Sequence, residues 1–294
     1  ELIPGAASAL YGPVAFNGLL YTRTKSPFEF QGLSVEQKTG VNHVASPTGD
    51  GAKPFSETAL RYAKAFANRF AFKLNASYLR GRDWYAADYT DVDPNTSPEL
   101  RGANNPGANG LNVYGDEVAQ TLPGIGRVSR TGYVEKDLTN YDVYSLRLNG
   151  AVHYRVTPTV EAIYALNFTQ GTANYTGSSR FILNDFQLTQ HRLELRGSHF
   201  FVRVYSTAEN SNNSYNTRSL GQLINRTWVR DLTGNVVTPD KADATWFQRY
   251  AAAFGGSISG VSGQNHDAAR AFADQGRFVP GSGEFDREKE TYIG

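Results

Sequence analysis

The chain has 294 residues, with 29 basic and 28 acidic side chains and a formal net charge of +1. That balance gives no global electrostatic case for binding nucleic acid or an anionic membrane surface, and the absence of cysteine excludes disulfides, thiolate metal sites and cysteine nucleophiles. No stretch approaches the ~18 consecutive apolar residues of a spanning helix, but a membrane β-barrel needs no such run, because its strands alternate apolar and polar residues.

The first part of the chain changes from turn-rich to alternating sequence. Residues 1–24 are rich in small residues and punctuated by glycine and proline, whereas period-2 alternation begins at about residue 33 and continues to 44. Residues 57–66 and 70–78 alternate in the same way and are separated by three residues, 67–69. Two alternating runs joined by a tight turn predict a β-hairpin.

The alternation stops at residue 81 and returns near residue 144. The intervening stretch, 81–140, is rich in aspartate, glycine, asparagine and proline, so we predict a long loop. Four further strands are then expected, at 144–156, 160–169, 186–196 and 200–207. Beyond them, the pattern favours amphipathic helices at Thr217–Trp228 and Asp243–Phe254 and a short one at Ala268–Asp274.

The connections between the predicted strands are short and long in alternation. Short turns fall near 67–69, 157–158 and 197–198, whereas long polar connections cover 45–56, 81–140, 173–185 and the region after 208. Transmembrane barrels have this asymmetry, with short periplasmic turns and longer outer loops. Soluble sandwiches usually have loops clustered at both ends, so the rhythm favours a membrane barrel.

The opening residues resemble a known family. The run from Glu1 to Pro13, followed by Ala15–Gly18, resembles the end of the plug domain of TonB-dependent receptors, most closely those of the Bacteroidetes type. Segments 62–66, 70–78 and 83–84 resemble the first barrel hairpin of that family. The plug-motif positions, expected to be structural or gating, are Pro4, Gly5, Ser8, Tyr11, Gly12, Asn17 and Gly18.

The resemblance implies an all-β fold. We expect a fragment of a transmembrane antiparallel β-barrel, roughly its first seven strands, preceded by the last part of a plug domain and carrying long outer loops with short helices. The expected boundaries are 1–32 for the end of the plug and 33–294 for the N-terminal part of the barrel. Barrels of about 22 strands with a plugged lumen are the relevant architecture. Because the chain begins with Glu1 and contains no Met, we interpret it as an internal or processed segment.

The same resemblance implies active import across the bacterial outer membrane. The expected partners are the TonB energy-coupling complex, reached through a segment outside this chain, outer-membrane lipid, and a small or oligomeric nutrient ligand such as a siderophore, cobalamin, a glycan or a peptide. Nucleic acid is not an expected partner, and no cofactor is expected. The sequence contains no catalytic constellation, so we predict a receptor rather than an enzyme.

Charge placement fixes the orientation of the predicted strands. Arginine or lysine at the lipid midplane costs roughly 2–4 kcal/mol, so the face carrying Arg147 and Arg155 is expected to point into the lumen. The candidate lumen residues are Arg147, Asn149, His153, Arg155, Glu161 and Asn167. We predict that replacing Leu148 by arginine abolishes assembly, whereas Arg147→Ser is tolerated.

Two metal-site patterns are weak. Asp91-x-Asp93-x-Asn95 begins like a calcium loop, but Thr96 stands where such a loop has glycine, and Gly102 where it has glutamate. The five histidines are dispersed, with no pair four residues apart. A solvated acidic loop is therefore favoured, and no metal site is predicted.

Two other classes of protein fit parts of the pattern. A surface binding protein or adhesin on a barrel scaffold would lack energised transport. A soluble carbohydrate-binding β domain would use the Asn- and Tyr-rich loops, such as 210–215, and would need no detergent. The helical stretch after residue 215 is a candidate external lid or docking surface.

Overall fold

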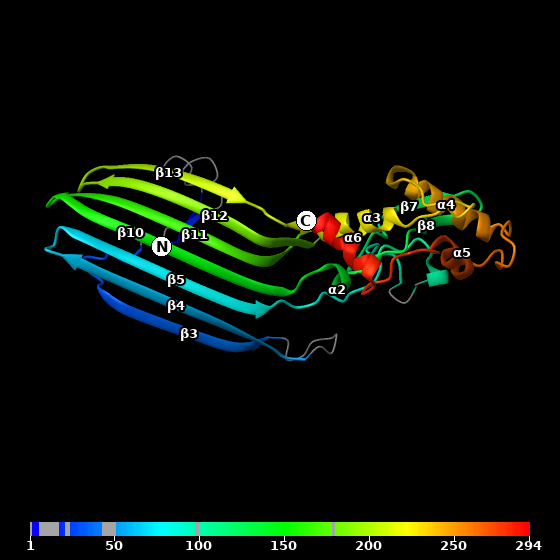
Figure 1. Cartoon of the computed structure of the whole chain (residues 1–294), viewed down its shortest axis with the longest axis horizontal. Coiled ribbons are helices and arrows are strands. Elements are labelled where there is room, and N and C mark those ends of the chain that lie inside the picture. The colour runs from blue at the N-terminus through cyan, green and yellow to red at the C-terminus, as the bar shows by residue number, and fades with distance from the viewer. Residues whose placement is uncertain are drawn as a thin grey trace.

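A long antiparallel sheet forms one end of the molecule, and helices with short strands gather at the other (Figure 1). The computed structural model describes residues 2–5, 18–20, 24–42, 51–97, 100, 102–177 and 180–294. Among these residues, no helix is long and apolar enough to cross a membrane.

The main sheet has seven long strands in the order β13-β12-β11-β10-β5-β4-β3, all antiparallel, and a short β14 that pairs with β12. Their bounds are β3 Gly32–Asn42, β4 Lys53–Phe66, β5 Phe70–Arg82, β10 Asp142–Thr157, β11 Val160–Thr176, β12 Arg180–Arg196, β13 Phe201–Asn210 and β14 Tyr215–Asn216. The seven long strands match the seven predicted segments. In the described part of the chain, β3 and β13 are open edges, so the predicted antiparallel sheet is confirmed, but the described strands do not close into a barrel.

Strands β11 and β12 run well past their predicted ends. The register between them shifts between Gly171 and Ala173, and such a bulge reverses the face on which later side chains lie. The extra residue lies in β12, where two residues separate Phe186 from Leu183 while one separates Gly171 from Ala173 on β11, so period-2 alternation does not extend from residue 186 back to Arg180. At Gly171, a Cβ would lie 2.5 Å from the carbonyl oxygen of Tyr144 on β10, so only glycine fits this close approach.

The predicted hairpin turn at 67–69 is a tight turn with left-handed residues. Ala67 and Asn68 have φ of 46° and 51°, and the amide of Arg69 donates to the carbonyl of Phe66 at 3.0 Å. Two consecutive residues with positive φ are the mark of the turns that match strand twist. Asparagine tolerates this conformation, whereas alanine adopts it at a cost.

A second folded unit, here called the cap, consists of residues 83–141 and 215–294. Its N-terminal part contains the 3-10 helix η1 Gly102–Asn104, strands β6 Val113–Tyr114, β7 Ala119–Leu122, β8 Gly126–Ser129 and β9 Tyr133–Val134, and helix α2 Glu135–Leu138. Its C-terminal part contains helices α3 Thr217–Thr227, α4 Pro239–Phe254, α5 His266–Ala273 and α6 Gly283–Ile293. The three predicted helices are confirmed, and α4 begins four residues earlier than predicted because Pro239 starts it.

The prediction that 81–140 is a long loop is wrong in its detail. This stretch supplies buried residues to two cores whose other members lie about a hundred residues later. One core joins Leu122 and Val128 to Trp228, Trp246 and Tyr250 of the helical part. The local sequence shows no periodicity because strands of two to four residues are too short to display one.

A short strand pair and a connecting segment precede the main sheet in the chain. Strands β1 Leu2–Pro4 and β2 Gly18–Leu20 form an antiparallel pair in which Pro4 is opposite Gly18. Gly5 has a φ of +91°, the left-handed geometry expected of a turn glycine. The predicted plug positions Ser8, Tyr11, Gly12 and Asn17 lie outside the described residues. Residues 24–31, here called the strap, lead from β2 into β3.

Candidate functional site

The two faces of the main sheet differ in chemistry and in exposure. One face, here called the outer face, presents apolar side chains to the surroundings, with exposed fractions such as 55% for Leu74 and 66% for Val204. The other, the inner face, is polar, yet it buries Lys73 and Glu194 to 4% and 3% exposure. The exposed apolar residues of the outer face include Leu33, Val35, Leu60, Tyr62, Phe66, Phe70, Leu74, Tyr78, Leu148, Val152, Tyr154, Tyr164, Leu193, Leu195, Val202 and Val204. A water-soluble sheet has the opposite arrangement.

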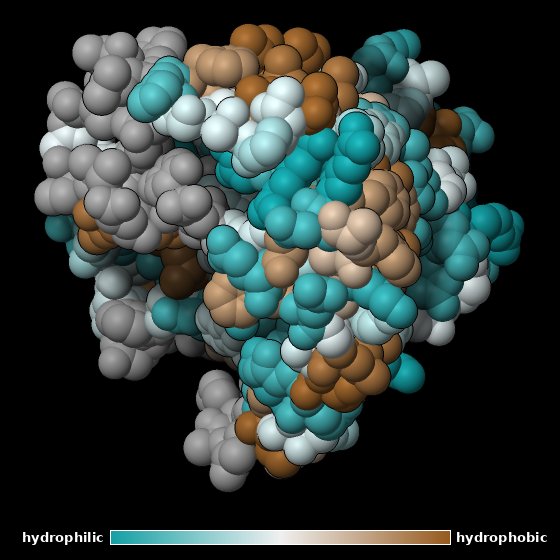
Figure 2. All heavy atoms as spheres, turned by 90° about the vertical axis from the view of Figure 1, so that its left-hand side faces the viewer, coloured by the Kyte–Doolittle hydropathy of each residue, from teal (hydrophilic) through white to brown (hydrophobic). Residues whose placement is uncertain are grey.

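Brown hydrophobic side chains are also visible from the end of the sheet at which the short turns lie (Figure 2). Among the aromatic residues at this end, the rings of Phe66 and Phe70 are stacked at 6.1 Å, and the guanidinium of Arg69 lies 5.4 Å from the ring centre of Tyr154. Aromatic and cationic side chains are therefore combined where the strands end.

All six candidate lumen residues lie on the inner face, as the strand register requires. Arg147, Asn149, His153 and Arg155 alternate along β10, and Glu161 and Asn167 stand opposite them on β11. Their role as lumen residues remains a prediction.

A row of carboxamides crosses the inner face from strand to strand. Asn75 donates to Asn149 at 2.7 Å, Asn149 donates to Asn167, Asn167 donates to Gln190 at 3.2 Å, and Gln190 donates to Thr207 at 3.4 Å. These five residues occupy directly paired positions on β5, β10, β11, β12 and β13. Because a carboxamide can both donate and accept a hydrogen bond, neighbouring members of the row bond to one another and hold the strands in register.

The strap covers the inner face toward the short-turn end. The ammonium of Lys73 donates to the hydroxyl of Thr24 at 2.8 Å and to the carbonyl of Lys25 at 3.1 Å. The guanidinium of Arg155 stands 4.0 Å from the ring centre of Phe28, and that ring meets His153 edge-on. Cations of the wall are thus used to hold the strap.

Carboxylates on the inner face are shared among several cations. Glu161 contacts the Nδ1 atom of His153 at 2.6 Å and an Arg196 nitrogen at 3.2 Å, so it does not pair with its cross-strand neighbour Arg155. Glu194 is held by Arg203 at 2.9 Å and Arg192 at 3.3 Å. At the short-turn end of the inner face, these carboxylates are therefore paired with neighbouring cations.

Between the strap and the cap, the inner face is open. A cavity of about 770 Å³ lies over the carboxamide row and is lined from the strap by Lys25 and from the sheet by Arg61, Arg147 and Glu36, among others. A second cavity of about 340 Å³ lies nearer the cap and shares Arg147 and Thr169 with the first. Arg147 therefore stands where the two cavities join.

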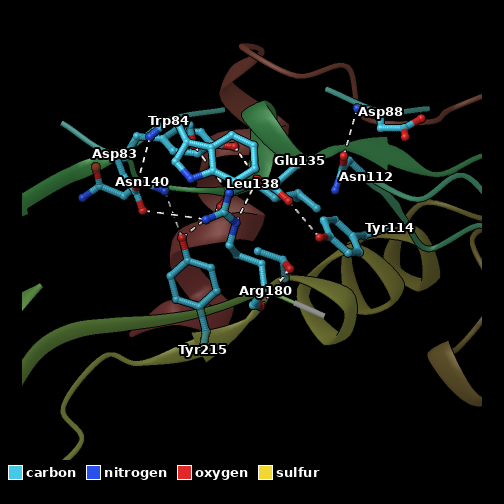
Figure 3. Close-up of polar contacts among 12 residues, drawn as sticks. Asp83, Trp84, Asp88, Asn112, Tyr114, Glu135, Leu138, Asn140, Arg180 and Tyr215 are labelled. Atoms are coloured by element: carbon cyan, nitrogen blue, oxygen red, sulfur yellow. Dashed lines mark hydrogen bonds and ion pairs between the residues drawn. The ribbon is translucent and has the colours of Figure 1, made fainter. Parts of the chain in front are cut away.

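A buried ionic network connects the cap to the sheet (Figure 3). Glu135 of α2, which is 1% exposed, accepts the Nε–H of Arg180 at 3.0 Å, the hydroxyl of Tyr141 at 2.8 Å and that of Tyr114 at 2.9 Å. Burial and the neighbouring carboxylate raise the pKa of Tyr114 to about 12, and they raise the pKa of Tyr141 as well. These phenols are therefore fixed donors, and the acid is fully satisfied.

The guanidinium of Arg180 also lies next to an exposed aromatic ring, that of Trp84. Its guanidinium lies 5.2 Å from the ring centre of Trp84, which is 52% exposed, and 3.7 Å from Asp83. A cleft of about 610 Å³ opens beside Trp84 and is lined also by Tyr85 and Asp88. Arg180 and Glu135 lay in segments predicted as loops, and nothing local marks them, because their pairing joins residues 45 positions apart.

The possible metal ligands are not gathered. The side chain of Asp91 accepts from Asn105 at 2.8 Å, and that of Asp93 accepts from the amide of Asn95. Across the described residues, no group of three His, Asp or Glu side chains is placed to hold a metal ion. Of the histidines, His43 lies outside the described part, whereas His191 contacts the Tyr164 hydroxyl at 2.9 Å on the outer face.

Comparisons with protein-family models, curated proteins and solved structures find no match to this chain.

Proposed function

We propose that this chain belongs to an outer-membrane active-transport receptor of the TonB-dependent type, which imports a bulky nutrient. The observation that carries the proposal is the exposed apolar outer face of the sheet, with a polar inner face behind it. Leaving that many apolar side chains in water forfeits the burial that drives folding, roughly 25 cal/mol per Å². Lipid is the solvent in which this arrangement is stable.

The spacing of the aromatic residues supports the same solvent. On the outer face, Phe66, Phe70 and Tyr154 lie near the short turns, and Tyr78 and Tyr144 lie near the cap, 6.4 Å apart. Phe70 and Tyr78 are eight residues apart on β5, about 27 Å along the strand. A barrel tilt of roughly 40° reduces this to about 20 Å of height, close to the ~25 Å band between aromatic girdles in barrels.

The inner face and the edges of the sheet fit a plugged barrel. The strap lies on the polar wall and leads directly from the plug-like N-terminal segment into β3, the first strand of the sheet. Both β3 and β13 have open edges, and unpaired edges of this length require further strands. Pairing with strands outside this chain would complete the barrel.

A surface-binding receptor without transport is a second candidate, favoured by the cap. The cap has its own cores, holds the Trp84 cleft, and is fixed to the rim by Arg180 and Glu135. Dependence of uptake on TonB separates the two candidates. A soluble carbohydrate-binding domain is disfavoured by the exposed outer face.

The test uses the full-length protein, expressed in a Gram-negative host with an epitope in the exposed link at Gly260, between α4 and α5. The proposal predicts a heat-modifiable band in the outer-membrane fraction, epitope labelling on intact cells, and ligand uptake that is lost without TonB. A soluble product would refute it. Outer-membrane insertion with uptake or binding independent of TonB would favour the surface-binding receptor.

A further inference from the structure

The open part of the inner face, here called the trough, comprises the two neighbouring cavities. The cavity above the strap and the cavity below the cap share Arg147 and Thr169. A solute descending from the cap toward the plug-like segment would therefore pass Arg147.

The trough is lined by cations without acidic partners. The Nε–H of Arg147 donates to the Ser145 hydroxyl at 3.2 Å, and within the described residues no carboxylate lies within ion-pair distance of Arg147. Arg61 donates to a backbone carbonyl, that of Phe30, at 2.7 Å, and the ammonium of Lys25 lies over the Phe30 ring. None of these contacts neutralises a positive charge.

The acids near this trough are already engaged or absent. Glu36, which lines the first cavity, pairs with Lys38 at 3.0 Å, and Asp83, which lines the second, lies 3.7 Å from Arg180. Residues 2–23, which precede the strap, contain Arg23 and no aspartate or glutamate, whereas Glu1 and the strap residue Glu29 are acidic.

Neutral donors surround the same position. The hydroxyl of Thr169 lines both cavities with Arg147, that of Ser145 lines the second, and the carboxamides of Asn75 and Asn149 line the first. A planar guanidinium beside hydroxyl and amide donors is the arrangement that binds oxyanions in fixed orientation.

We propose that the trough binds an oxyanionic solute, whose carboxylate or phosphate group contacts Arg147 while Arg61 and Lys25 supply further positive charge. The inference rests on the proposed function and narrows it: the imported nutrient, or the part of it that reaches the wall, is negatively charged. Neutral glycans would gain nothing from these cations.

The test measures binding by the full-length receptor, purified in detergent, using isothermal titration calorimetry at low ionic strength. The probes are tricarballylate for carboxylates, inorganic phosphate for phosphates, and maltotriose as a neutral control. Arg147→Ser is compared with Arg196→Ser, which removes a charge from the same face but at its ion-paired, short-turn end. A heat-modifiable band is recorded for every variant, so that folding is established separately.

We expect wild type to bind at least one anionic probe with an affinity that falls as salt is added, and not to bind maltotriose. Arg147→Ser should weaken binding tenfold or more, and Arg196→Ser less than threefold. The preferred probe distinguishes carboxylate from phosphate. Heat-modifiable protein that binds neither anion, or that loses affinity equally in both variants, overturns this inference alone. Protein that never becomes heat-modifiable overturns the proposed function and the inference with it.

Discussion

The neighbouring residues Leu148 and Arg147 provide a matched pair of substitutions. Leu148 is 42% exposed on the outer face and is paired with Ala76 on β5 and Phe168 on β11. On β5, Leu74 lies midway between Phe70 and Tyr78, and the Ala76–Leu148 pair is the next pair on the outer face. Arg147 points to the opposite face. If the outer face meets lipid, Leu148→Arg places a cation near the midplane at a cost of roughly 2–4 kcal/mol. That cost lowers the ratio of folded to unfolded protein by about 30- to 900-fold.

The assay is urea-dependent refolding of the full-length receptor into lipid vesicles, followed by the heat-modifiable band. Leu148→Arg is expected to shift the transition by the full lipid cost and to abolish assembly in cells. Arg147→Ser removes a single hydrogen bond to Ser145 and should change stability by less than about 1 kcal/mol. Equal folding of both variants would show that the outer face does not meet lipid.

Three further predictions concern the cap and the strap. Glu135→Gln leaves the buried Arg180 with only the more distant and more exposed Asp83 as an anion, so the cap should lose about 3 kcal/mol, seen as faster hydrogen exchange in α2 and α3 with little change in β3–β5; unchanged exchange in α2 would contradict this. Burial raises the pKa of the Asp116 carboxyl to about 7, from a value of 3.8 in the unfolded chain. Between these two pH values the folded cap holds a proton that the unfolded chain releases. The free energy of unfolding of the cap should therefore fall by up to about 4 kcal/mol as pH rises from about 4 to about 7. Asp116→Asn should flatten that profile in thermal melts, and a wild-type profile already flat across this window would argue against it. Phe28→Ala removes the ring under Arg155 and should cost the strap about 1–2 kcal/mol, measured as faster trypsin cleavage at Lys25 and Arg23, with the exposed neighbour Glu29→Ala as control.

The strands could be predicted because each carries its own signal. Alternation predicts all seven strands, and together with the charges at Arg147 and Arg155 it predicts that six polar residues share one face. The predicted strands stop short where the strand register shifts, as between Gly171 and Ala173, because the sequence no longer alternates there. The described strands do not form a closed barrel, because β3 and β13 lie at opposite edges of the sheet and do not pair with each other.

The cap could be predicted only in pieces. Helices α3 and α4 have amphipathic patterns, but α6 buries a single residue, Phe285, and so has no apolar stripe to detect. The connection between the cap and the sheet depends on the ion pair between Glu135 and Arg180. These residues are far apart in the sequence, so no local pattern predicts their contact. For the trough around Arg147, alternation in the sequence predicts the polar face. The lack of an acidic partner for Arg147 is evident only from the contacts in the structure.

The orientation of the sheet faces can be measured directly, because the chain contains no cysteine. Single cysteines at 147, 148, 149, 150, 151 and 152 of β10, each carrying a nitroxide label, would be placed in the full-length receptor in lipid vesicles. Power saturation is expected to alternate, with labels at 148, 150 and 152 accessible to oxygen in the bilayer and those at 147, 149 and 151 shielded from it. Accessibility of the even positions to a water-soluble nickel chelate, or the absence of alternation, would contradict the assignment of the outer face to lipid.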